Sequence, residues 1–97
     1  MTTKEINEYL WSTFAIDMQA MKAEGDYIGT RILFDWAVIV WFNTEYKKLE
    51  IMIRTPAPYA EKSREEVEKM LEQKFAECEQ VAQVKRLAHE RIDIWFK

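Results

Sequence analysis

The chain contains few of the residue types that build covalent, metallic or flexible features. Among its 97 residues are one cysteine, one histidine, two glycines and two prolines. A single cysteine excludes an internal disulfide and fits a reducing compartment. One cysteine and one histidine are too few ligands to close a structural zinc site. Gly25 and Gly29 do not form a phosphate-binding loop, so we expect neither a metal nor a cofactor.

A long apolar run is also missing. The longest, residues 37–42, is far shorter than the roughly 20 residues that span a bilayer. Residues 1–10 lack the basic start and apolar centre of a signal peptide. We therefore expect a cytoplasmic protein without a membrane segment. The net charge of −3 argues against direct binding of nucleic acid, which normally requires a basic surface.

The chain does contain enough apolar material for one core. Hydrophobic residues make up 48% of it and aromatic residues 13%, far too much for a disordered chain. This length is that of one domain, so residues 1–97 are predicted to fold as a single unit.

The first predicted helix covers residues 3–24. Thr2 and Glu5 have the spacing of a capping box, in which each side chain satisfies a free backbone N–H of the helix start. Gly25 is suited to end the helix. Apolar residues recur on one helical face: Ile6, Leu10, Phe14, Met18 and Met21.

The second predicted helix covers residues 61–79. Ser63 and Glu66 offer a second capping box, although Glu61 is an alternative start. The apolar side of this helix comprises Val67, Met70, Leu71, Phe75 and Cys78.

Alternating patterns predict the strands. Residues 32–42 are apolar at both alternations, which predicts one long central strand covered on both faces. Residues 43–46 suit a hairpin loop, and residues 49–54 alternate as an antiparallel partner. Residues 92–96 also alternate, whereas residues 81–88 fit either a strand or an extension of the second helix. The predicted fold class is α+β: two amphipathic helices packed on an antiparallel sheet of three to four strands, in the order α-β-β-α-β(-β).

The residues that could form a catalytic site are few. Cys78 and His89 are the minimum for a thiol nucleophile with its base. The alternative interpretation is stronger, because Cys78 falls on the apolar side of its helix and His89 lies in a polar, turn-like stretch. Nothing marks two carboxylates as an acid–base pair. We therefore expect a protein that is not an enzyme.

The acidic residues are concentrated in the two helical segments. Residues 1–27 and 60–79 each carry a charge of −3, whereas residues 28–59 and 80–97 carry +1 and +2. On a helical wheel, five carboxylates of the second helix fall within about 60° of one another, in an exposed row about 27 Å long. The row comprises Glu61, Glu65, Glu68, Glu72 and Glu79, and a second acidic group comprises Asp17, Glu24 and Asp26.

Such a row has two interpretations. Its spacing of about 5–6 Å is comparable to that of phosphates along a DNA strand, so it could occupy a basic surface in place of DNA. Alternatively it is a solvated helix face with local pairs such as Glu65–Lys69. For Asp17, which lies near the apolar stripe, the alternative is a salt bridge to Arg31 or Arg54.

Three tryptophans exceed the needs of a small core: Trp11, Trp41 and Trp95. Core packing is the simpler interpretation, and anchoring of a protein interface is the other.

As a whole, the chain resembles small phage-encoded type I-F anti-CRISPR proteins. The resemblance rests on its length, on the Glu-rich second helix and on the N-terminal sequence MTTKEINEYLWSTFAIDMQAMKAEGD. The resemblance implies an inhibitor in the cytoplasm of the host bacterium that binds Cas proteins of the type I-F crRNA-guided surveillance complex. It further implies that the inhibitor, monomeric when bound, blocks target DNA without touching nucleic acid itself. The acidic surface would then mimic the DNA phosphate backbone. The alternative is a small phage or plasmid accessory protein acting as a protein–protein interaction or dimerisation module, through its sheet and tryptophans.

Overall fold

The computed structural model describes residues 1–87 and 90–97. Its helices are α1 (Thr3–Phe14) and α2 (Arg64–Ala76), and a 3-10 turn, η1, covers Met18–Ala20. Its strands are β1 (Lys22–Glu24), β2 (Asp26–Leu33), β3 (Trp36–Asn43), β4 (Lys48–Pro56), β5 (Val81–Leu87) and β6 (Arg91–Phe96).

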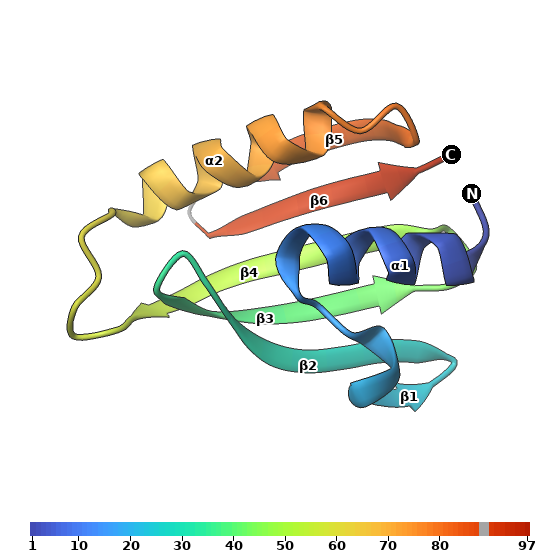
Figure 1. Ribbon diagram of the computed structural model, residues 1–97, viewed down its shortest axis with the longest axis horizontal. Coiled ribbons are helices and arrows are strands. Elements are labelled where there is room, and N and C mark those ends of the chain that lie inside the picture. Colours follow the sequence, from blue (N-terminus) through green and yellow to red (C-terminus); the bar gives the residue numbers. More distant parts are fainter. Residues whose placement is uncertain (88–89) are drawn as a thin grey trace.

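The strands form one antiparallel sheet in the order β1-β2-β3-β4-β6-β5, with both helices on the same side (Figure 1). The predicted α+β class is confirmed, whereas the predicted number of three to four strands and their order were wrong. None of the helices in the described residues has the length and hydropathy that crossing a bilayer requires.

The first helix is shorter than predicted. Its capping box is present, with the Glu5 amide donating to Thr2 Oγ1 over 3.1 Å. The helix ends at Phe14 because Ala15 adopts the left-handed conformation, with φ of 55°. Beyond it, Met18 and Met21 reach the same core from η1 and its C-terminal end, so the helical spacing misled the prediction of 3–24. Gly25, with φ of 85°, forms the turn between β1 and β2 instead of a helix cap.

The predicted long strand 32–42 is in fact the hairpin of β2 and β3. Phe34 and Asp35 make its two-residue turn with φ of 51° and 66°. Two positive φ values give a turn whose twist matches that of the paired strands. The turn was missed because neither residue is the glycine or asparagine that usually marks it.

The second helix and the C-terminal strands agree better with the predictions made from the sequence. Ser63 Oγ accepts from the Glu66 amide over 3.2 Å, which confirms the capping box, although α2 is shorter than the predicted 61–79. Residues 81–87 form a strand, so of the two possibilities for them, a strand or an extension of the second helix, the strand is correct. Residue 88 lies outside the described residues.

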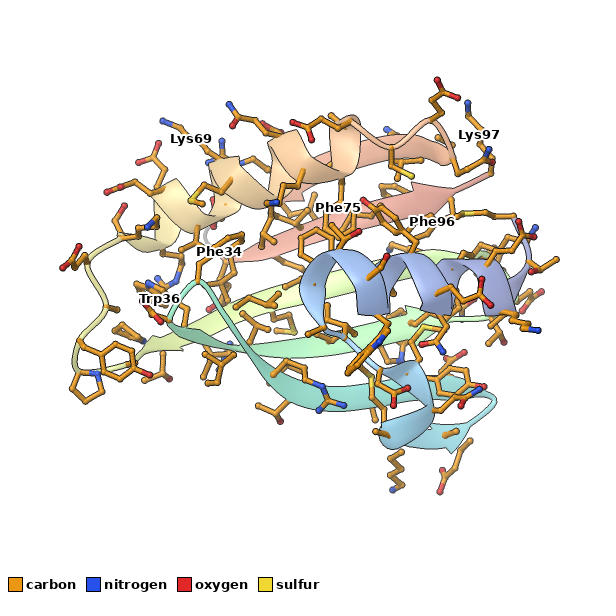
Figure 2. All side chains as sticks on the ribbon, in the orientation of Figure 1. Phe34, Trp36, Lys69, Phe75, Phe96 and Lys97 are labelled. Atoms are coloured by element: carbon orange, nitrogen blue, oxygen red, sulfur yellow. The ribbon has the colours of Figure 1, made fainter. Side chains whose placement is uncertain are left out.

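The core lies between the helices and one face of the sheet. The rings of Phe14 and Phe75 stack with centroids 4.6 Å apart and join α1 to α2. Phe75 and Phe96 point into the space between the helices and the sheet (Figure 2). Strand residues of the same core, all 5% exposed or less, are Leu33, Val38, Val40, Phe42, Leu49, Ile51, Ile53, Ile92, Ile94 and Phe96.

Candidate functional site

The side of the sheet opposite the helices is the main candidate surface, and we call it the open face. Because successive strand residues point to opposite sides, burying Val38, Val40 and Phe42 turns the alternate residues of β3 outward. No helix of the described chain lies on this side (Figure 1). Cross-strand pairs on the open face of β2 and β3 are Ile28–Trp41, Thr30–Ile39 and Ile32–Ala37.

Apolar side chains form a band across the middle of the open face. Ile28 is 45% exposed and Ile32 61% exposed. Beside them, Trp41 and Ile39 are half-buried, and Met52 of β4 lies opposite Ile39. A contiguous apolar patch that is partly exposed is a candidate interaction site. We call these five residues the apolar band.

A compact charge cluster occupies the adjoining part of the open face, on β4 and β6. The Lys48 ammonium lies 3.0 Å from Asp93 and 3.4 Å from Glu50. The Arg91 guanidinium lies 2.9 Å from Asp93 and 3.4 Å from Glu50. Two cations and two anions thus neutralise one another. We call these four residues the charge quartet.

The quartet is held tightly. Asp93 is only 2% exposed, so its carboxylate depends on these cations. Partial burial alone would lower the pKa of Lys48, but the hydrogen bond and charge of Asp93, together with the charge of Glu50, raise that pKa overall. Lys48 also lies 5.0 Å from the centre of the Trp95 ring, a cation–π contact. The quartet is therefore a fixed, neutral part of the surface.

The acidic row of the second helix is not the continuous exposed row that the wheel predicted. Glu61 precedes α2 and Glu79 follows it, both exposed. Glu68 is only 7% exposed, and its carboxylate lies 3.0 Å from Arg86 of β5. The prediction failed there because α2 packs on β5, whose position was open in the sequence.

Two further carboxylates of the row face solvent to different extents. Glu65 is exposed and lies 3.4 Å from Lys69, the local pair that the solvated interpretation expected. Glu72 is half-buried. The carboxylates that remain accessible on α2 are therefore separated by a buried ion pair.

The second acidic group lies far from the first, because β1 and β5 are opposite edges of the sheet. Asp17 caps η1 by accepting from the Gln19 amide over 3.0 Å. The predicted salt bridge of Asp17 is wrong: Arg31 donates to the backbone oxygen of Asp17 over 3.2 Å, and Arg54 pairs with Glu90.

Glu24 and Asp26 lie at the β1 end of the open face. With three neighbours they line a shallow recess of about 210 Å³, whose residues are Lys22, Glu24, Asp26, Ile28 and Trp41. The structure therefore brings these two carboxylates to the apolar band and separates them from α2.

The remaining candidates fall into three groups. Trp11 is 59% exposed and Trp41 and Trp95 are half-buried on the open face, so core packing was the wrong interpretation for them. Cys78 is a half-buried free thiol, and His89 lies outside the described residues, so the dyad, which the sequence already made the weaker interpretation, stays untested. Within 1–87 and 90–97, no three histidine, cysteine or carboxylate side chains gather as metal ligands.

The sequence reasoning missed Ile28, Ile32 and Ile39 as surface residues. It took residues 32–42 for one strand covered on both faces and gave Ile28 no role. A usable signal was available, since only two helices were predicted, and two helices of this length cover one side of a sheet.

A scan against models of protein families, a search of curated proteins and a search of solved structures each found no match.

Proposed function

We propose that the chain is a non-enzymatic protein-binding module and that the open face is its contact surface. The observation that carries this proposal is the apolar band, in which Ile28 and Ile32 are 45% and 61% exposed beside Trp41. Aromatic and aliphatic side chains of this kind form the centres of protein interfaces.

The free energy of burying apolar side chains favours binding of a partner to this face. Full burial of an isoleucine side chain contributes about 1.5–3 kcal/mol, so Ile28 and Ile32 together leave on the order of 2 kcal/mol unrealised in the isolated chain. The charge quartet limits the desolvation cost of binding, because its four side chains already pair with one another and Asp93 is already buried. A face that combines an apolar band with charges that pair among themselves suits a protein surface better than nucleic acid.

The test compares capture of proteins from a lysate of the source cell. The variant Ile32→Lys/Ile39→Lys places two charges in the apolar band and leaves the core untouched. The matched control, Gln73→Lys, adds a lysine at an exposed position of α2, on the helix side. Proteins held by wild type and by the control but lost from the double variant support the proposal. Identical profiles for all three proteins contradict it, provided that their circular dichroism spectra agree.

A second candidate is the inhibitor of a type I-F surveillance complex, as the resemblance implies. Exposed Glu65 on α2 supports it, as do Glu24 and Asp26 beside Trp41, because carboxylates and an aromatic face suit the lysines and arginines of a DNA-binding surface. In this form the contact uses two separate acidic patches in place of one continuous row.

This candidate is tested with the purified type I-F complex and its target duplex in a mobility-shift assay. Wild type is expected to prevent DNA binding, more weakly at higher salt. The variants Glu65→Lys/Glu72→Lys and Glu24→Lys/Asp26→Lys examine the two patches separately. Normal DNA binding in the presence of wild type refutes this candidate and leaves the protein-binding module intact.

A further inference from the structure

We propose that the open face is covered by a second copy of this chain, with β3 of each copy crossing β3 of the other at Ile39. This inference rests on the proposed function and names the partner that the face fits best. The arrangement is a two-fold dimer in which the two sheets stack face to face. The two-fold axis lies midway between the sheets, parallel to their planes, and runs perpendicular to the strands.

The size of the face matches a stable interface. Strands lie about 4.8 Å apart and rise about 3.3 Å per residue, so the six strands present on the order of 600 Å² in projection. Stable interfaces bury roughly 800 Å² of accessible surface per partner, and a side-chain surface exceeds its projection. Sheets stacked face to face also form an ordinary core about 10 Å thick.

The shape of the apolar band favours this axis. Along β3, bulk is concentrated at one end, where Trp41 pairs with Ile28, whereas the other end carries Ala37 beside Ile32. An axis perpendicular to the strands reverses β3 and seats Trp41 over the other copy's Ala37, with Ile39 meeting its own counterpart. An axis along the strands would set Trp41 against Trp41 and leave a gap at Ala37. Large-on-small packing fills the space without voids.

The charges of the open face favour a partner without a strong net charge. The quartet is matched within one chain, so a partner of strong single sign would meet charges that are already paired. Reversing the strands sets Arg91, which lies level with Met52 and Ile39, near its own counterpart, and Asp93 and Glu50 of each copy remain its partners.

The first test is the mass in solution, measured by light scattering at high micromolar concentration. The dimer has twice the chain mass of 11.7 kDa. Ile39→Lys sets two lysines together on the axis and is expected to raise the dimer dissociation constant about 30-fold or more, as loss of a central interface residue does. Gln73→Lys, which adds a lysine at an exposed position of α2 on the helix side, is the control and stays dimeric.

The second test fixes the register. In a Cys78→Ser background, Ile39→Cys is expected to give a covalent dimer with a short bis-maleimide. Ile28→Cys, on the same face, is expected not to crosslink to itself, because reversal separates the two positions by about 13 Å along the strand. A mixture of Ile28→Cys and Ile32→Cys chains is expected to crosslink.

Three results overturn the inference. They are a mass of one chain for wild type, a dimer unaffected by Ile39→Lys, and crosslinking of Ile28→Cys chains to each other in place of Ile39→Cys chains. If wild type is monomeric and Ile32→Lys/Ile39→Lys still loses a captured protein, the inference fails and the proposed function stands. If that variant loses nothing, both fail.

Discussion

Reversing the charge of Glu68 distinguishes the buried ion pair from the exposed acidic row. Glu68 lies 3.0 Å from Arg86, and the two side chains are only 9% and 27% exposed. Glu68→Lys places a second cation at this site and removes the partner of Arg86. We expect it to destabilise the fold strongly, whereas Glu65→Lys on the solvent side changes stability by less than about 0.5 kcal/mol.

The magnitude follows from the burial. Removing one partner of a buried ion pair costs about 3–5 kcal/mol, and the partial exposure of Arg86 favours the lower end. A loss of about 3 kcal/mol lowers the midpoint of thermal unfolding by roughly 12–24 °C in a chain of this size. Glu68→Gln keeps the shape and one hydrogen bond, so we expect a loss of about 1–2 kcal/mol.

The assay is urea unfolding followed by circular dichroism, with wild type, Glu68→Lys, Glu68→Gln and Glu65→Lys compared under one buffer. With a urea slope of about 1.5 kcal/mol/M, the midpoint of Glu68→Lys falls by about 2 M. A midpoint within experimental error of wild type refutes the buried ion pair. The result also matters for function, because any inhibition lost on reversing Glu68 would then report unfolding.

Three further predictions concern the fold and the charge quartet. Asp35→Gly removes a side chain from a position with φ of 66° and is expected to raise the free energy of unfolding by about 0.5 kcal/mol in urea titration. Trp36→Phe removes the indole N–H that donates to Lys62 O over 2.8 Å, and calorimetry should show a loss of about 2 kcal/mol. The raised pKa of Lys48, due mainly to Asp93 once burial is outweighed, gives stability that is complete below the unfolded pKa of 10.5 and is lost as pH rises through the folded pKa. Unfolding free energies measured from neutral to alkaline pH should therefore decline more steeply for wild type than for Lys48→Met.

The parts of the fold that follow from local rules were predictable. Both capping boxes, Thr2 with Glu5 and Ser63 with Glu66, depend on residues three positions apart. The alternation of residues 49–54 likewise determines which side of β4 is buried. The α+β class needed no more than these patterns and the chain length.

The failures involve tertiary context. No local sequence signal shows that Ala15 takes a left-handed conformation. Met18 is buried beyond it at a spacing that fits a continuing helix, so the helix was predicted too long. The Phe34–Asp35 turn carries no glycine, so the hairpin of β2 and β3 was predicted as one strand. Glu68 was placed in solvent because Arg86 belongs to a strand whose position relative to α2 no periodicity reveals.

The candidate site was harder to predict than the fold, because it depends on which side of the sheet the two helices leave uncovered. Trp41 was singled out by residue type alone. Ile28 and Ile32 became visible as surface residues only once β2 and β3 were separate strands beneath no helix.

The central claim is that the open face binds protein. The most direct measurement is quantitative mass spectrometry of proteins captured by wild type, by Ile32→Lys/Ile39→Lys and by the control Gln73→Lys, with a second, differently tagged copy of the chain present. We predict that wild type and Gln73→Lys retain a common binding protein, the tagged copy among the candidates, and that the double variant loses it while remaining folded. Equal retention by all three proteins would contradict the claim.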